Sequence, residues 1–126
     1  MNNSIIGIGN AIIDVFVHVD DAFLVKNKLT KGSMKLYKKN EFDELKKNIK
    51  VEKIVAGGSV ANSMAGISFL NGNSSFVGKI SLDNFGLLYK KNLQEAKVDF
   101  LYSEKKESLS TGASIILITP DSERTM

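Results

Sequence analysis

The chain has 126 residues, of which 43% are hydrophobic and 25% are charged, and its formal net charge is +3. This composition fits one folded domain and excludes the class of disordered chains, which combine low hydrophobicity with high net charge. The basic residues are interspersed with acidic ones and form no stripe with aromatic residues, which argues against a nucleic-acid surface. With no cysteine and one histidine, the chain cannot form disulfides or thiolate zinc sites, and we expect no metal site.

The first residues do not have the pattern of an export signal or a membrane span. Residues 1–4 contain no basic residue, and the Ile-rich stretch that follows is interrupted by Gly7, Gly9, Asn10 and Asp14. A signal peptide or a spanning helix needs an unbroken apolar run. We therefore expect the protein to work in the reducing cytoplasm.

The first fifty residues predict three strands and two helices. Residues 5–8 are apolar and lead into a Gly-Ile-Gly-Asn turn, and residues 13–19 alternate valine with other types, the period-two pattern of a strand. A short helix is expected at 20–25 and a strand at 33–37. The next predicted helix has Asn40 as its N-cap, with acidic residues near its start and lysines near its end.

The rest of the chain predicts four more strands and two more helices. We expect a strand at 51–55 and, after a glycine pair, a helix at 59–70 that is rich in small residues and closed by Gly72 as its C-cap. A fifth strand is expected at 75–80. The clearest helix covers 83–96, and an apolar stripe on it comprises Phe85, Leu88, Leu93 and Ala96.

The last two predicted strands cover 98–102 and 113–119, and Phe69, Phe76 and Phe85 are predicted core residues. The order of elements mixes strand-helix-strand units with pairs of consecutive strands. This order predicts an α/β fold with an appended antiparallel portion.

Two glycine motifs invite a nucleotide-binding interpretation, and both fail. Residues 7–12 begin like a dinucleotide-binding turn, but Ile12 stands where a third glycine or alanine is needed and no acidic residue ends the following strand. Residues 72–80 resemble a phosphate loop, but five residues separate Gly72 from Gly78, and Ile80 replaces the hydroxyl residue that would bind magnesium.

A more informative set of residues lies at two strand ends. Asn10 and Asp14 flank the passage from the first strand to the second, and a carboxylate and an amide buried there could be satisfied by a polyhydroxyl ligand. Gly57 and Gly58 stand at a strand-to-helix junction, where they let a ligand approach backbone N–H groups, and Asn62 lies one turn into the helix. The alternative is that Asp14 ends a strand in solvent and the glycines form an ordinary turn.

These motifs resemble those of the PfkB kinases. The resemblance rests on Gly-Asn-x-x-x-Asp at 9–14, Ala-Gly-Gly-Ser-x-x-Asn at 56–62, Phe-Val-Gly-Lys at 76–79, Asp83 to Gly86 at a helix start, and the stretches 111–112 and 119–126. It runs over nearly the whole chain and is closest to bacterial adenosine-kinase-like and sugar-kinase-like members. Ser59 stands where ribokinases proper carry lysine, which argues against ribose as the substrate. The Gly-Asp or Asp-Asp that usually precedes the helix in this family is also replaced, here by Ser81-Leu82-Asp83.

The resemblance implies a ribokinase-like fold in which this chain forms part of the central sheet and an antiparallel β lid. It implies that Asn10 and Asp14 hold ring hydroxyls, that Gly57 and Gly58 form the hinge of the lid, and that Asn62 binds the sugar. The activity implied is transfer of a phosphoryl group from ATP, with Mg²⁺, to a primary hydroxyl of a sugar or nucleoside.

The catalytic motif of that family, Asp-Thr-x-Gly-Ala-Gly-Asp, does not occur in residues 1–126. We therefore expect no catalytic residue here and take 1–126 as the amino-terminal substrate-binding and lid portion of a larger kinase, inactive by itself. An uncovered sheet edge or lid strand would favour self-association. The alternative is a free-standing, non-catalytic domain that binds a sugar or a partner.

Overall fold

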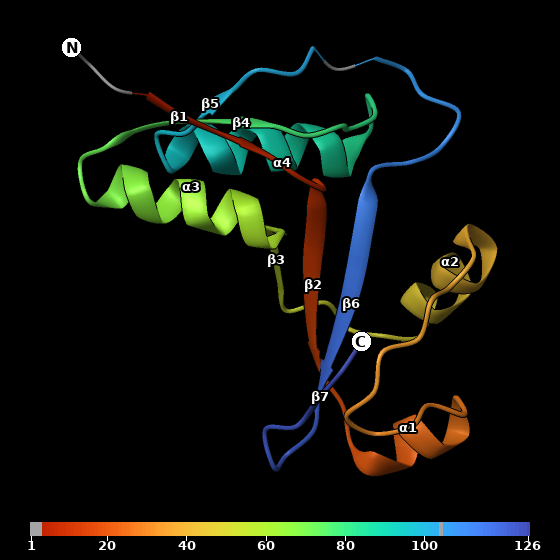
Figure 1. The fold of residues 1–126 in the computed structure, drawn as a ribbon. Helices are drawn as coiled ribbons and strands as arrows, with labels where there is room; N and C mark the ends of the chain where they lie inside the picture. The colour runs from red at the N-terminus through yellow and green to blue at the C-terminus, as the bar shows by residue number, and fades with distance from the viewer. Residues whose placement is uncertain (1–3, 104) are drawn as a thin grey trace. The chain divides into compact units, whose positions relative to one another are not determined.

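The computed structural model describes residues 4–103 and 105–126 (Figure 1). The strands are β1 (Ser4–Ile8), β2 (Ile12–His18), β3 (Lys53–Gly57), β4 (Asn73–Val77), β5 (Asp99–Phe100), β6 (Gly112–Ile118) and β7 (Arg124–Thr125), and the helices are α1 (Asp21–Lys26), α2 (Lys39–Lys47), α3 (Ser59–Phe69) and α4 (Asn84–Glu95). The expected α/β class is confirmed. The chain divides into two compact units, one formed by the residues up to Asp14 with Val55–Ala113, the other by Val15–Ile54 with Ser114–Met126.

The first unit contains a parallel three-stranded sheet in the order β1-β4-β5. β1 and β4 pair over their full length, from Ser4 opposite Asn73 to Ile8 opposite Val77. The sequence connects β4 to β5 through α4, a helical crossover of the kind that neighbouring parallel strands require. α3 packs on β1 and β4, and a Cβ at Gly7 would lie only 2.6 Å from the side chain of Val60, so glycine permits the close approach of that helix.

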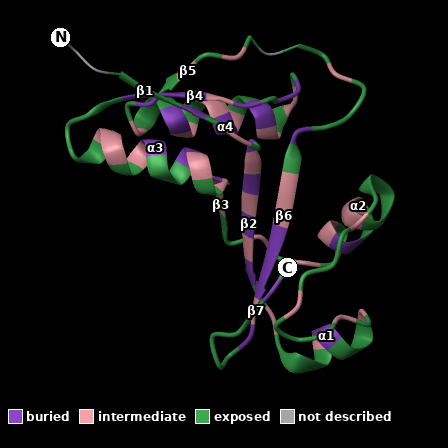
Figure 2. Ribbon diagram, in the orientation of Figure 1, coloured by how far each residue is buried: buried purple, intermediate pink, exposed green. Residues whose placement is uncertain are grey.

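The core of this unit is built around an aromatic cluster. Phe76 of β4 and Tyr89 of α4 have no exposed surface, and Phe100 lies beside both, with ring centroids 6.3 and 6.1 Å away. Figure 2 shows the buried positions along α4 and β4 as purple segments. Aromatic rings bury large apolar areas and prefer such tilted or offset contacts, so this cluster fixes α4 against the sheet.

The second unit contains most of β2 and β6, which belong to a four-stranded sheet in the order β3-β2-β6-β7. Burial alternates along β2 as predicted, with Val15 and Val17 buried, Phe16 partly exposed and His18 exposed. β7 pairs antiparallel with β6.

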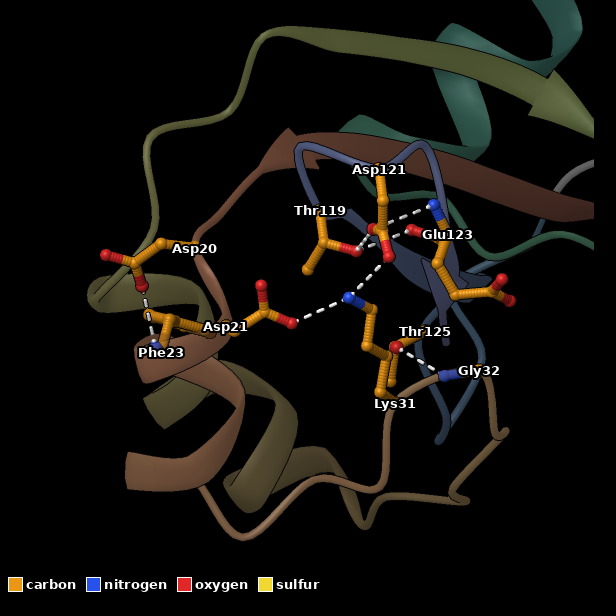
Figure 3. A network of polar contacts seen from close by, with 9 residues as sticks. All are labelled: Asp20, Asp21, Phe23, Lys31, Gly32, Thr119, Asp121, Glu123 and Thr125. Atoms are coloured by element: carbon orange, nitrogen blue, oxygen red, sulfur yellow. Dashed lines mark hydrogen bonds and ion pairs between the residues drawn. The ribbon is translucent and has the colours of Figure 1, made fainter.

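Lys31 links two segments of the second unit. Its Nζ lies 2.7 Å from a carboxylate oxygen of Asp21 at the start of α1 and 2.7 Å from one of Asp121 in the turn between β6 and β7. Figure 3 shows the lysine between the two carboxylates, with the Thr119 hydroxyl donating to Asp121 and the Gly32 N–H donating to Thr125. Hydrogen bonds from the Lys31 ammonium and the Thr119 hydroxyl hold the pKa of Asp121 down at about 2.

The predicted strand at 33–37 is wrong. This segment is not a strand, and Met34 and Leu36 are 70% and 87% exposed. The segment makes two backbone hydrogen bonds with Met126: the Met126 N–H donates to the Ser33 carbonyl, and the Lys35 N–H donates to the Met126 carbonyl. Two hydrogen bonds to a single residue are too few for a strand ladder.

Both predicted helix caps are wrong, although the predicted ends of α1, α3 and α4 differ from the observed ones by at most one residue. Lys38, not Asn40, is the N-cap of α2, because the Glu41 carboxylate accepts from the Lys38 N–H. α3 ends at Leu70 as its C-cap, and Asn71 rather than Gly72 takes the left-handed conformation that follows, at φ 63°. Asparagine is the residue other than glycine that most readily replaces it at this position.

Two further corrections concern strand bounds and core residues. β3 begins and ends two residues later than predicted, β4 ends at Val77 so that Gly78 lies outside it, and the short strand β7 was not predicted. Phe76 is buried as predicted, but Phe69 is 87% exposed. In the part of the chain that the structure describes, no helix has the length and apolar character needed to cross a membrane.

Candidate functional site

Asp14 lies on β2 with its carboxylate against the backbone of Gly57. A Cβ on Gly57 would lie 2.2 Å from Oδ2 of Asp14, so any larger residue at this position would push the carboxylate out of its place. The carboxylate is half-buried, and burial raises the pKa of Asp14. None of the described residues donates a hydrogen bond to it. A half-buried carboxylate without a donor is costly in the free protein and ready to accept hydrogen bonds from a ligand.

Asn10 and Gly58 meet beside this contact. Gly58 is the N-cap of α3 and has a φ of +94°, a conformation that L side chains rarely adopt. A Cβ at Gly58 would also lie 2.6 Å from the carbonyl oxygen of Asn10, whose own side chain is exposed. The structure therefore brings together four of the five residues singled out by the sequence: Asn10, Asp14, Gly57 and Gly58.

Asn62 lies on the first turn of α3, where its N–H donates to the carbonyl of Gly58 at 3.0 Å. Its side chain is exposed and makes no hydrogen bond with Asp14. It lines a shallow pocket of about 290 Å³ between residues of β3, α3 and α4. The backbone of the fifth predicted residue, Asn62, thus lies next to Gly58, and Asn62 lines this pocket.

Two residues of α4 that the sequence analysis missed hold the end of β3. The Asn92 side-chain oxygen accepts from the Ala56 N–H at 2.8 Å, and the Tyr89 hydroxyl donates to the Gly57 carbonyl at 3.2 Å. The predicted stripe on this helix left Tyr89 out, whereas the residues buried on it are Gly86, Tyr89 and Leu93. Their spacing of three and four residues is the signal that could have found Tyr89.

The Asp83 to Gly86 motif proves to be a structural junction. Asp83 caps α4 by accepting from the Gly86 N–H at 2.7 Å, and it also accepts from the N–H and the hydroxyl of Thr111, both at 2.8 Å. Gly86 is required here, because a Cβ would lie 2.0 Å from the carbonyl of Ser81. This cluster ties the start of α4 to Thr111, directly before β6.

With this geometry in place, comparison with known proteins identifies the family. The family model described as pfkB family carbohydrate kinase matches residues 26–126. Adenosine kinase 2 of Arabidopsis thaliana is 32% identical over 114 residues, covering 86% of this chain and 32% of the plant protein. Fructokinase of Escherichia coli is 34% identical over 68 residues, covering 54% of this chain and 22% of the bacterial protein.

The fold agrees with this assignment. The crystal structure of adenosine kinase from Sinorhizobium meliloti matches with a TM-score of 0.86 at 30% identity, over 98% of this chain and 38% of that one. The chain thus spans about a third of the length of the plant relative and of this solved structure. The expected ribokinase-like α/β fold is confirmed, and the chain belongs to the PfkB family of carbohydrate kinases.

Proposed function

We propose that these 126 residues form the amino-terminal, substrate-holding and lid portion of a kinase that phosphorylates a primary hydroxyl of a sugar or nucleoside. In this proposal the Asp14 carboxylate accepts hydrogen bonds from ring hydroxyls, and the Asn10 side-chain amide binds ring hydroxyls as well. Gly57 and Gly58 form the hinge of the lid, and Asn62 completes the sugar contacts. Phosphoryl transfer itself belongs to residues outside this chain.

One observation carries the proposal. The Asp14 carboxylate is half-buried against Gly57, burial raises its pKa, and no described residue supplies it with a donor. An ionised carboxylate with two free oxygens suits two neighbouring hydroxyls, as on a ribose or a furanose ring, because each can donate one charge-assisted hydrogen bond.

The acceptor class is supported by the relatives. They include proteins named adenosine kinase and fructokinase, and a nucleoside and a ketose both present vicinal hydroxyls beside a primary hydroxyl. We propose adenosine first, because the adenosine kinase match extends over 86% of the chain, against 54% for the fructokinase.

We propose ATP with Mg²⁺ as the phosphoryl donor of the whole protein. The residues described here do not by themselves fit the metal: across 4–103 and 105–126, no group of three or more histidine or acidic side chains is placed to hold an ion. We therefore assign none of these residues to ATP or Mg²⁺.

Calorimetry of the natural protein with adenosine, ribose and fructose tests the proposal, with a coupled assay for ADP release. Asp14→Asn should weaken the binding of the preferred ligand by about 10- to 100-fold, because hydrogen bonds to a charged acceptor are lost. Asp99→Asn is the matched control, since Asp99 is exposed on β5, and it should bind as the natural protein does.

The outcomes separate kinase from binding module. Ligand-dependent ADP release supports the kinase, whereas tight binding without turnover of ATP supports a free-standing sugar-binding domain. Loss of affinity in both variants, or in neither, would contradict the role given to Asp14.

A further inference from the structure

α4 is fastened to two consecutive residues at the end of β3. Asn92 accepts from the Ala56 N–H at 2.8 Å, and Tyr89 donates to the Gly57 carbonyl at 3.2 Å. Residues three apart lie on the same face of a helix. One face of α4 therefore bonds both the N–H of Ala56 and the carbonyl of Gly57, the last two residues of β3.

The Tyr89 side chain is a rigid anchor. It has no exposed surface, and its ring lies beside those of Phe76 and Phe100 at centroid distances of 6.0 and 6.1 Å. Burial raises the pKa of Tyr89, and the nearby Asp14 charge raises it further. The hydroxyl is therefore protonated at neutral pH and available as a donor.

Gly57 contacts both Tyr89, through its carbonyl, and the carboxylate of Asp14. The Asp14 carboxylate lies so close to the Gly57 α-carbon that an added methyl group would be 2.2 Å from Oδ2. Because no described residue donates a hydrogen bond to this carboxylate, its position depends on its own strand and on the backbone beneath it. A displacement of Gly57 would therefore change both the position of the carboxylate and its access to water.

We propose that Tyr89 is a positioning residue of the Asp14 site, and that its bond to the Gly57 carbonyl holds the backbone on which the carboxylate lies so that Asp14 stays open to a polyhydroxyl ligand. The proposal rests on the proposed function, because it takes the ligand to be a sugar or nucleoside. It adds a residue of α4, which does not touch that ligand, to the determinants of its affinity.

The test compares Tyr89→Phe with Tyr102→Phe in the natural protein. Both substitutions remove one phenolic hydroxyl and keep the ring, but the Tyr102 hydroxyl donates to Glu107, at 3.1 Å, instead of to the hinge. Three quantities are measured: the dissociation constants for adenosine and fructose by calorimetry, the Asp14 pKa by carbon-detected NMR titration without ligand, and the thermal unfolding midpoint.

We expect Tyr89→Phe to weaken binding of the preferred ligand by about tenfold, because it leaves the Gly57 carbonyl without its donor. The pKa of Asp14 should fall toward its ordinary value as the loosened backbone admits water. Tyr102→Phe should change neither quantity. A lower unfolding midpoint with unchanged affinity and unchanged Asp14 pKa would reduce Tyr89 to a structural residue and overturn the proposal.

The titration keeps this test separate from that of the proposed function. If the natural protein binds neither adenosine nor fructose, the proposed function fails, and the Asp14 pKa still decides the role of Tyr89. A fall of that pKa in Tyr89→Phe alone then supports positioning, and an unchanged value rejects it.

Discussion

Asp14 shows how a residue proposed to bind a ligand can cost stability in the free protein. Its raised pKa means that folding favours the protonated carboxyl, so above the unfolded-state pKa the ionised side chain opposes folding. This opposition disappears as the pH falls below the unfolded-state pKa. A carboxylate with such a cost suits a ligand that supplies the missing donors, which is why this one side chain supports the proposed function more than the glycines beside it.

The left-handed backbone at Gly58 gives the first stability prediction. Gly58→Ala should lower the free energy of unfolding by about 2 kcal/mol or more, because a side chain at φ +94° is strained and its Cβ would lie 2.6 Å from the Asn10 carbonyl oxygen. Urea unfolding measures the effect. Gly66→Ala, inside α3 with no atom within 4 Å of its Cβ, is the control and should stabilise by about 0.5 to 1 kcal/mol. Equal effects of the two substitutions would show that the backbone conformation at residue 58 does not require glycine.

At the scale of elements, sequence patterns predicted the helices and strands whose positions depend on residues within the segment itself. The alternation of β2 and the helical pattern of α3 and α4 are set by residues within each segment, and their positions were predicted to within one residue at each end. The end of β3 was not, because the extent of a strand depends on its pairing with a neighbouring strand, here β2, which lies about forty residues earlier in the sequence. Asn92 and Tyr89, more than thirty residues away, also bond to its last two residues. The motifs at 9–14 and 56–62 predicted that Asn10, Asp14 and the glycine pair form a site. No local pattern predicted that side chains of α4 bond to the backbone of Ala56 and Gly57 at that site.

The junction between α4 and β6 gives a prediction with a pH dependence. Asp83→Ala should lower the free energy of unfolding by about 2 kcal/mol, since it removes a helix cap together with two bonds to Thr111. Asp20→Ala is the matched control, because Asp20 caps α1 through one bond, to the Phe23 N–H, and should cost about 1 kcal/mol. Urea unfolding at pH 7 compares the two.

The same junction should weaken in acid. Burial alone would raise the pKa of Asp83, but hydrogen bonds from Thr111 and Gly86 outweigh it and hold the pKa below its usual value. The stabilisation is therefore complete above the unfolded-state pKa and is lost as the pH falls through the lower, folded-state pKa. The difference between natural protein and Asp83→Ala should shrink in that range, and a difference that is constant with pH would argue against the ionised cap.

At the scale of the whole chain, the sheet of the first unit leaves an apolar strand at its edge. β1 is the outer strand of the order β1-β4-β5, and its residues Ile5, Ile6 and Ile8 are 49%, 59% and 76% exposed. An uncovered apolar edge strand pairs readily with another chain, since its backbone groups on that side have no ladder partner. We therefore propose that the 126-residue chain, prepared by itself, associates with copies of itself through β1.

Sedimentation velocity over a concentration series tests this association. Ile6→Lys should shift the 126-residue chain toward the monomer, because a charged side chain on an edge strand opposes pairing with a second edge. Gln94→Lys adds the same charge at an exposed position of α4 and should leave the association unchanged. The comparison separates the effect of a charge on the edge strand from the effect of a higher net charge. If both variants dissociate equally, general charge repulsion is responsible and not the edge. If the unsubstituted chain sediments as a monomer at every concentration, the exposed isoleucines do not drive pairing, and the apolar edge of β1 needs another explanation.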